Sequence, residues 1–344
     1  MFKKLAIVIF TIGLILAASC YYLNNVGDNG KDPRDAVKTV LSPFGIVNLT
    51  KSPEELRKEK SIFKDKKNLN VLLIGTDSSL TRRAKGQTGF NTDALILLSV
   101  NPEKNIVLLT SVPRDLWVKG NKINALYILY GWETLKGAFE EITGQTLDGY
   151  IMTDFDGFRW IVDSFGGAPV EIKNSFTDTT FPDLQDYGVV TISFALGEEK
   201  MSGQRALTYS RSRHGDNGEG SDLMRAKRQH LVLQGMLDGI SQPESIFWPM
   251  DIPKFYEIVT QHMETTLTLD DVYYLWDFYK DRDKYKIESF VVGSDYLYYP
   301  GMYPDSPYRA WVFIPIGNDF TKLQTDITSK LEGIFISSAP AVEN

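Results

Sequence analysis

The stretch YSRSRHGDNGEGSDLMRAKRQ, residues 209–229, carries five of the 37 lysine and arginine residues of the chain. Arg211 and Arg213 are two positions apart, so in an extended backbone their guanidinium groups leave the same side of the chain. The glycine-rich residues 215–220 predict a turn that reverses the chain. Basic side chains before and after this turn are therefore expected to converge on one spot.

The residues after the turn predict a helix with one polar face. Ser221 is a typical N-cap, and Asp222, Arg225 and Gln229 follow with the i, i+3, i+7 spacing of a shared helix face. Guanidinium groups bind phosphate or carboxylate with paired hydrogen bonds, so converging arginines predict an anion site. The competing interpretation is a solvated charged helix behind a loop, and this stretch alone does not separate the two.

Composition narrows the class of protein. The 344 residues suffice for one large or two modest domains once a targeting segment is removed, and 43% hydrophobic residues are ordinary for a globular chain. A net charge of −7 argues against a broad nucleic-acid surface, so we expect no nucleic-acid partner. Cys20 is the only cysteine, which excludes a disulfide, a thiol nucleophile and a cysteine-bound metal from the rest of the chain.

An uncharged apolar run at residues 5–23 is about long enough to span a bilayer. Two lysines precede it and none directly follows, which predicts a cytoplasmic tail at residues 1–4 and an extracytoplasmic body held at the cell membrane by a single-pass anchor. The alternatives are a cleaved signal peptide ending near residues 17–19 and a lipoprotein signal at Cys20. All three place the body outside the membrane.

Beyond the apolar run we expect a polar spacer at 24–68, a folded body at 69–335 and a tail at 336–344. Apolar and alternating segments predict strands at 70–75, 94–100, 106–111, 150–153, 170–172, 286–292 and 311–316. Helical patterns cover 123–130, 133–142, 155–165, 203–209, 252–263, 269–279 and 320–331. Residues 177–187 are interpreted as a polar, breaker-rich insertion. Strands and helices mixed throughout predict one α/β body.

Acids and arginines recur where the predicted strands end. Asp77, Asp93 and Arg114 occupy such positions, and ligands of open α/β sheets bind at strand ends. Two carboxylates can hold Mg²⁺ while arginines bind phosphate oxygens, a combination suited to phosphoryl transfer. The alternative is that both acids only cap turns and pair with nearby arginines. The three histidines show no metal-ligand spacing, and the common catalytic motifs of NTPases, α/β-hydrolases and zinc proteases are missing.

The order of these motifs resembles the LytR-CpsA-Psr (LCP) family. The resemblance runs over residues 70–237, and the motifs that carry it are VLLIGTD at 71–77, NTD at 91–93, SVPRD at 111–115, KIN at 122–124, DFDGF at 154–158, GQRAL at 203–207, YSRSR at 209–213 and DLMRAKRQ at 222–229. A single membrane segment before the body also fits that family. The resemblance implies a single α-β-α layered domain with a mixed central sheet.

The resemblance further implies an enzyme, a Mg²⁺-dependent or Mn²⁺-dependent phosphotransferase at the outer face of a membrane. It would move a glycopolymer, such as teichoic acid or capsule, from a polyprenyl-pyrophosphate carrier to a peptidoglycan sugar hydroxyl and release polyprenyl phosphate. Its partners would be the lipid-linked glycopolymer, peptidoglycan and the membrane. The alternative is a protein that binds or hydrolyses polyprenyl pyrophosphate without ligase activity.

Residue by residue, the resemblance assigns roles to ten positions. The metal residues would be Asp77 and Asp93, and the catalytic residues would be Asp93, Arg114, Arg211, Asp222 and Arg225. Substrate-binding residues would be Arg83, Lys122, Arg213 and Gln229. The sequence departs from the family where Ser79 follows Asp77-Ser78 in place of an arginine, and we expect Arg82 or Arg83 to replace that contact. The base that accepts the proton of the attacking hydroxyl is either Asp93 or Asp222.

Overall fold

The computed structural model describes residues 57–183, 188–239, 245–246, 251–303 and 310–334. It divides into residues 1–61 and residues 62–344, and every strand and helix considered below belongs to the second unit. The predicted anchor at 5–23, Cys20 and the tail at 336–344 lie outside the described residues. Within the described ranges, no helix combines the length and the apolar character needed to cross a membrane.

A mixed six-stranded sheet forms the centre of the body, in the order β11-β6-β1-β2-β3-β12. β1 lies parallel to β6 and antiparallel to β2, and β3 lies antiparallel to β2 and parallel to β12. The strands are β1 (Leu69–Thr76), β2 (Thr92–Asn101), β3 (Ile106–Ser111), β6 (Gly149–Thr153), β11 (Glu264–Thr265) and β12 (Lys286–Val291). β1 lies in the interior of the sheet, between β6 and β2, which explains its continuous apolar run. The parallel and antiparallel pairings confirm the predicted mixed sheet.

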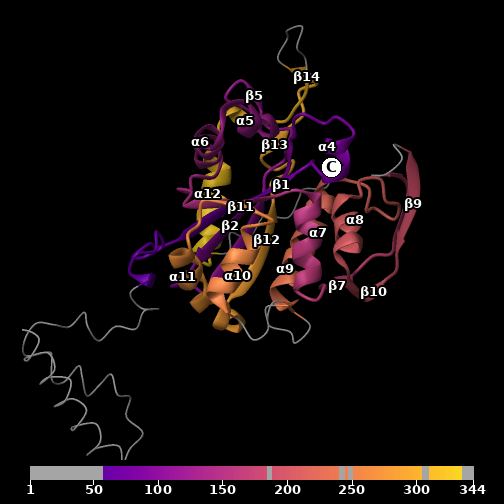
Figure 1. The fold of residues 1–344 in the computed structure, drawn as a ribbon. Coiled ribbons are helices and arrows are strands. Elements are labelled where there is room, and N and C mark those ends of the chain that lie inside the picture. Colours follow the sequence, from indigo (N-terminus) through magenta and orange to yellow (C-terminus); the bar gives the residue numbers. More distant parts are fainter. Residues whose placement is uncertain (1–56, 184–187, 240–244, 247–250, 304–309, 335–344) are drawn as a thin grey trace, which may run out of the picture. The chain divides into compact units, whose positions relative to one another are not determined.

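Alternating residues of the strands enter two different cores. Leu72 and Ile74 pack with apolar residues of α5, α6 and α12, while Val71 and Leu73 face a second cluster that includes residues of α11. The helices are α5 (Ile123–Tyr130), α6 (Trp132–Thr143), α11 (Leu269–Lys280) and α12 (Thr321–Leu331). Figure 1 shows α6 and α12 on one side of the sheet and α7, α8 and α9 on the other. The body therefore has helices on both faces of its sheet.

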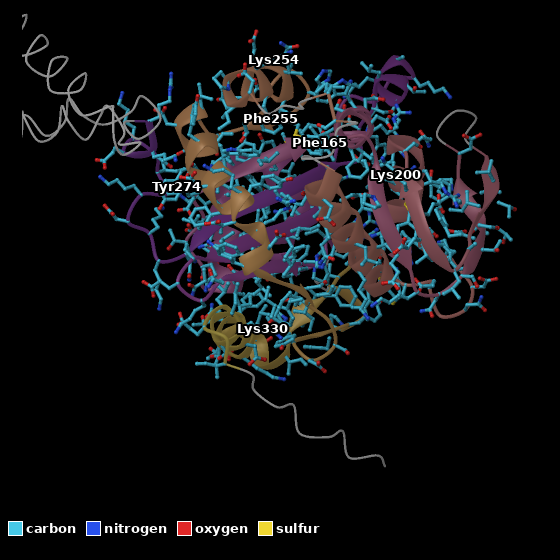
Figure 2. All side chains as sticks on the ribbon, turned by 90° about the horizontal axis from the view of Figure 1, so that it is seen from below. Phe165, Lys200, Lys254, Phe255, Tyr274 and Lys330 are labelled. Atoms are coloured by element: carbon cyan, nitrogen blue, oxygen red, sulfur yellow. The ribbon has the colours of Figure 1, made fainter. Side chains whose placement is uncertain are left out.

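A third core lies among the helices and small sheets that follow β6. It contains α7 (Phe155–Ser164), α8 (Gly203–Arg211), α9 (Asp222–Gly239), β7 (Ala168–Ile172) and β10 (Gly197–Met201). Phe165, which directly follows α7, stacks with Phe255 of α10 (Ile252–Val259) at a centroid distance of 6.3 Å (Figure 2). Helix α10, from the C-terminal half of the chain, thus packs against this core.

Three segments differ from expectation. Residues 177–187 were predicted as an irregular insertion, but β8 (Phe176–Pro182) pairs with β9 (Val189–Phe194), because Phe176 and Phe194 turn inward and stack. The predicted helix at 252–263 ends at Val259, since Glu264 and Thr265 continue as the edge strand β11. The predicted strand at 311–316 is two short strands, β15 (Ala310–Trp311) and β16 (Ile314–Pro315), that pair with β14 (Met302–Tyr303) and β13 (Leu297–Tyr298).

The remaining elements are short and lie beside the sheet ends. They include α4 (Leu80–Ala84), β4 (Trp117–Val118) and β5 (Asn121–Lys122). Ser79 caps α4 by accepting a hydrogen bond from the backbone N–H of Arg82 at 3.1 Å. This cap fixes the turn that follows β1 and thereby the direction in which the arginines of α4 leave the helix.

Candidate active site

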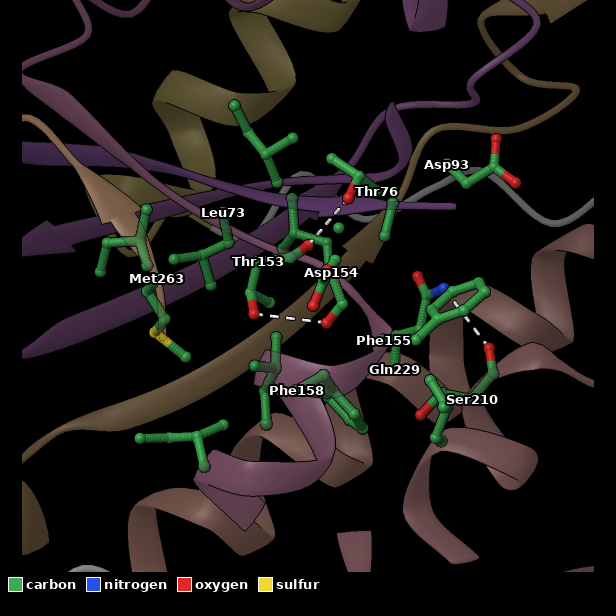
Figure 3. Close-up of a pocket in the computed structure, with 18 of the residues that line it drawn as sticks. Leu73, Thr76, Asp93, Thr153, Asp154, Phe155, Phe158, Ser210, Gln229 and Met263 are labelled. Carbon is green, nitrogen blue, oxygen red and sulfur yellow. Dashed lines mark hydrogen bonds between the residues drawn. The ribbon is translucent and has the colours of Figure 1, made fainter. Parts of the chain in front are cut away.

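A cavity of about 580 Å³ opens where β1, β2 and β6 meet α7, α8, α9 and α10. Its walls change character from one end to the other. Figure 3 shows Asp93, Ser210 and Gln229 toward one side and Leu73 and Met263 toward the other, with Phe158 along the wall between them. A ligand that fills the cavity must therefore be charged or polar at one end and apolar at the other.

Arg114 and Asp93 form the first ion pair of the polar end. Arg114 follows β3, Asp93 lies near the start of β2, and the antiparallel pairing of these strands brings them together. Arg114 Nη1 donates to Asp93 Oδ2 at 2.5 Å, and Arg114 Nε lies 3.5 Å from Asp115 Oδ2. Burial opposes the charge of Arg114, but Asp93 and Asp115 outweigh it and raise the pKa of the guanidinium. The side chain stays cationic at any physiological pH.

Asp77 follows β1 and holds the loop that leads to β2. Its Oδ1 accepts a hydrogen bond from the backbone N–H of Asn91 at 2.7 Å, and its Oδ2 lies 3.6 Å from Arg82 Nη1. Arg82 also donates to the Asp77 carbonyl oxygen at 2.7 Å. Asp77, Asp93 and Arg82 all line the cavity, so two carboxylates and a second cation border its polar end.

Arg211 is a largely enclosed cation of the cavity wall that leaves one donor unused. It is the last residue of α8, not part of an extended segment as its spacing from Arg213 suggested. Its guanidinium lies 4.5 Å from the ring centroid of Phe155 and 5.2 Å from that of Phe181. Nη1 is buried, and among the described residues it has no hydrogen-bond partner. Burial, reinforced by the charge of Arg82, lowers the pKa of Arg211 to about 10.

Arg225 presents a second unused donor from the opposite side. Ser221 Oγ caps α9 by accepting from the N–H of Met224 at 3.2 Å, which confirms the predicted helix start. Arg225 Nη1 lies 3.2 Å from Asp222 Oδ1, and its side chain is only 12% exposed. Its Nε is buried without a partner in the described structure. Burial lowers the pKa of Arg225 to about 10 although Asp222 opposes this effect.

The side chain of Arg213 spans the turn and links the residues before it to Asp222 after it. Its Nε and Nη2 each donate to one oxygen of Asp222 at 2.9 Å, a paired geometry that only a guanidinium provides. Asp222 is thus bound by Arg213 and Arg225, and although burial opposes its charge, these partners lower the pKa of its carboxyl. The predicted convergence of Arg211, Arg213 and Arg225 across the turn is confirmed, because all three line the same cavity.

Arg228 stabilises the turn at residues 215–220 and does not line the cavity. It is 1% exposed and donates to the carbonyl oxygens of Tyr209, Ser212 and Glu219 and to Glu219 Oε2. These contacts tie the last turn of α8 to the loop at 215–220. Arg228 therefore sets the spacing at which Arg211 and Arg225 face each other.

The ten predicted site residues fall into two groups. Seven line the cavity, namely Asp77, Asp93, Arg114, Arg211, Arg213, Arg225 and Gln229. The Nε2 of Gln229 lies 3.4 Å from the Ser210 carbonyl oxygen (Figure 3). Asp222, Arg83 and Lys122 are not in the wall. Arg83 donates to Ser78 Oγ and Asp154 Oδ2 and does not line the cavity. Arg82 of the same helix lines it instead. Lys122 pairs with Asp115 at 2.6 Å and orders the segment behind Arg114.

Sequence reasoning missed two carboxylates and the whole apolar wall. Asp154 caps α7 by accepting from the N–H groups of Asp156 and Gly157, and Asp178 is 1% exposed and accepts from Ser212 Oγ at 2.7 Å. Both line the cavity. Asp178 lies in the segment interpreted as an insertion. Only the pairing of β8 with β9 shows that this residue reaches the cavity wall. The apolar wall comes from distant elements and includes Leu73, Ile151, Phe158, Ile161, Leu233, Met236, Val259 and Met263.

The donor set at the polar end suits a magnesium ion that takes its remaining ligands from phosphate and water. Mg²⁺ is usually held by one or two carboxylates together with substrate phosphates, and Asp77 and Asp93 offer two carboxylates on one cavity wall. Nowhere in the described ranges do three or more acidic, histidine or cysteine side chains form a metal-binding group. The residues therefore fit an ion shared with a phosphorylated ligand, and not an all-protein cage.

Comparison with known proteins agrees with this architecture. The LytR_cpsA_psr family model matches residues 45–306. TagU of Bacillus subtilis is 29% identical over 289 residues, which cover 81% of this chain and 82% of that protein. TagV of the same organism is 26% identical over 276 residues, 78% of this chain and 66% of that relative's length. Both are named polyisoprenyl-teichoic acid–peptidoglycan teichoic acid transferases.

A solved structure of similar fold is that of protein gbs0355 from Streptococcus agalactiae. It superposes with a TM-score of 0.59 at 26% identity and covers 79% of this chain and 92% of that one. The sequence comparison shows the family, and the structural comparison supports the fold.

Proposed function

This chain belongs to the LytR_cpsA_psr family, and from that premise we propose that it transfers a glycopolymer from a polyprenyl-pyrophosphate carrier to a sugar hydroxyl of peptidoglycan. The polymer is of the teichoic-acid class or a related one, because TagU and TagV carry that activity in their names. The product that leaves is polyprenyl phosphate.

One observation carries this proposal: the cavity joins a cluster of arginines and aspartates to an apolar interior. A pyrophosphate places several negative charges at one point, and an isoprenoid chain requires an apolar groove. Arg211 Nη1 and Arg225 Nε are buried donors that no described residue satisfies. A buried donor without a partner costs free energy, so a bound anion that accepts from both stabilises the protein as well as the complex.

The reaction that these groups support is an in-line displacement at phosphorus. The acceptor hydroxyl oxygen attacks the phosphorus that carries the glycan, the bridging P–O bond of the pyrophosphate breaks, and its electron pair leaves with the lipid phosphate. Negative charge therefore grows on the leaving phosphate, and fixed guanidinium groups in a water-poor cavity stabilise that charge most in the transition state. Arg114, Arg211 and Arg225 supply these groups from the segment after β3, from α8 and from α9.

Of the two acids expected to take the hydroxyl proton, Asp93 is the better placed. Asp93 lines the cavity, whereas Asp222 does not, and both Asp222 oxygens are bound by Arg213. The lowered pKa of Asp222 also makes it a weak base. We assign the role of general base to Asp93 and the role of a positioning residue for Arg213 and Arg225 to Asp222.

Mg²⁺, or Mn²⁺ in its place, would be held by Asp77 and Asp93 together with the pyrophosphate. When bound, such an ion neutralises phosphate charge and makes the leaving phosphate a better leaving group. The hydrogen bond from the Asn91 N–H fixes Asp77 in its loop, so this carboxylate is preoriented before any ion arrives.

We also propose that the body works at the outer face of the cell membrane. The support is the uncharged run at 5–23 with lysines before it, together with a substrate whose lipid must stay partly in the bilayer. A C-terminal reporter active only outside the cytoplasm should give a signal. Signal from a cytoplasm-specific reporter at that end would contradict the topology.

The function itself is tested with a short lipid-pyrophosphate-linked glycan and purified peptidoglycan. Wild-type protein should join the labelled glycan to peptidoglycan and release one lipid phosphate per glycan transferred. If lipid phosphate and free glycan phosphate appear without any labelled peptidoglycan, water is the acceptor and the protein is a pyrophosphatase. If only binding is observed, it is a carrier-binding protein.

A further inference from the structure

The projecting ribbon formed by β13, β14, β15 and β16 exposes an unusual concentration of aromatic rings. We define the aromatic ribbon as Tyr298, Tyr299, Met302, Tyr303 and Trp311. Each of the five is at least 38% exposed, and Trp311 reaches 63%. Contiguous exposed apolar surfaces, unlike single exposed side chains, mark binding sites. The sequence motifs that indicate the family end at residue 229, and the family match ends at residue 306, so Trp311 lies beyond both.

The rings of the ribbon are ordered rather than loosely exposed. Tyr299 and Trp311 stack with a centroid distance of 4.6 Å and an interplanar angle of 2°. Tyr303 meets the ring of Trp117, on β4, edge to face at 5.8 Å and 84°. Mutual stacking fixes the rings before a ligand arrives, so a ligand that covers their outer faces loses little side-chain entropy on binding.

The ribbon is connected directly to the polar end of the cavity. The N–H of Trp117 donates to the Phe313 carbonyl oxygen at 2.8 Å, and the N–H of Phe313 donates to the Asp115 carbonyl oxygen at 3.0 Å. Asp115 is in turn the neighbour and ion-pair partner of Arg114. Figure 1 shows β14 at the same end of the body as α4 and α5, away from α10 and α11. A polymer bound along the ribbon therefore extends toward the polar end of the cavity.

The charge of the ribbon indicates what it binds. Residues 293–316 contain three charged residues, Asp295, Asp305 and Arg309, so this part of the sequence has one basic side chain and a net charge of −1. Segments that bind bilayer surfaces or polyanions combine aromatic rings with clusters of basic side chains, and a single arginine is no such cluster. Flat rings without charge instead suit the apolar faces and acetamido methyl groups of uncharged amino-sugar rings.

We propose that the aromatic ribbon is the docking surface for the acceptor, the β-linked N-acetylhexosamine strand of peptidoglycan. This inference rests on the proposed function, which makes peptidoglycan the acceptor. The lipid and pyrophosphate of the donor occupy the cavity, so the acceptor must approach from outside it. An extended strand that stacks on Trp311 and Tyr299 delivers one of its hydroxyl groups to the side of Arg114 and Asp93.

The test uses the full-length protein and two separate binding measurements. Co-sedimentation with peptidoglycan sacculi stripped of teichoic acid reports on the ribbon, and titration with farnesyl diphosphate reports on the cavity. We expect Trp311→Ala and Tyr299→Ala each to weaken sacculus binding about tenfold, as is usual when an aromatic anchor is removed. Farnesyl diphosphate binding should be unchanged. Trp311→Tyr keeps a ring at the position and should retain most of the sacculus binding.

A matched control is available on the opposite end of the body. Trp276 of α11, which is half-buried, stacks on Tyr279 at 4.8 Å, so Trp276→Ala removes a stacked ring outside the ribbon. It should leave sacculus binding intact. Undiminished sacculus binding by the Trp311→Ala and Tyr299→Ala variants would overturn the proposal, as would a loss confined to vesicle association or to self-association. A wild-type protein that fails to bind farnesyl diphosphate would instead reject the lipid-pyrophosphate function.

Discussion

Replacing Arg225 by lysine tests whether geometry, and not charge alone, supports transfer. Arg225 is 12% exposed, its Nη1 lies 3.2 Å from Asp222, and its buried Nε has no described partner. Lysine keeps the positive charge but has one ammonium group, which cannot pair with Asp222 and reach a phosphate in the same forked geometry. The variant therefore loses a donor directed at the anion.

The size of the effect follows from the loss of one charge-stabilising donor in an enclosed site. Such a loss costs about 2–4 kcal/mol of transition-state stabilisation, and the retained charge places this substitution near the lower half of that range. A loss of about 2–3 kcal/mol corresponds to a fall in kcat/KM of roughly 30- to 150-fold. Binding of farnesyl diphosphate should weaken by less than about tenfold, because the leaving phosphate gains its charge only in the transition state.

The assay is transfer of labelled glycan from a lipid-pyrophosphate donor to peptidoglycan, with thermal unfolding as the control for folding. Lys227→Ala is the matched variant, because Lys227 is exposed on the same helix and does not line the cavity. It should retain wild-type activity. Equal damage from Lys227→Ala and Arg225→Lys, or full activity of Arg225→Lys, would refute the assigned helix face.

Three other outcomes follow from the structure. The Asp77→Ala/Asp93→Ala double variant should lose Mg²⁺-stimulated transfer while remaining folded, and an unchanged Mg²⁺ titration would reject the metal assignment. Arg228→Met should lower the free energy of unfolding by about 3–5 kcal/mol, because it leaves the buried Glu219 carboxylate unpaired; adding Glu219→Gln should recover part of that loss in urea unfolding. Burial lowers the pKa of His230 to about 4 from 6.5, so its contribution to stability is complete above about pH 6.5 and is lost as the pH falls through 4. Urea unfolding should therefore show about 3 kcal/mol less stability at pH 4 than at pH 7 from this group, a difference that His230→Gln should remove.

Much of the architecture is local in origin and could be predicted from the sequence. The apolar run at 70–75 becomes the central strand β1, and the predicted helix at 123–130 coincides with α5, because hydrophobic periodicity and turn residues act over a few neighbours. The charged half of the site was predictable for a related reason. Arg211, Arg213 and Arg225 lie in one short stretch, so a single turn at 215–220 brings them together.

The sequence by itself therefore determined which guanidinium groups meet at the polar end of the cavity and the side of the turn from which each approaches. Only the tertiary structure decided that Arg82 rather than Arg83 borders the cavity, since the choice depends on the contact of Arg83 with Asp154, 71 residues away. The tertiary structure also decided which residues form the apolar wall and how the rings of the aromatic ribbon stack. Leu73, Phe158 and Met263 read individually as ordinary core residues, and they become a binding surface only because the sheet and three helices leave a space between them.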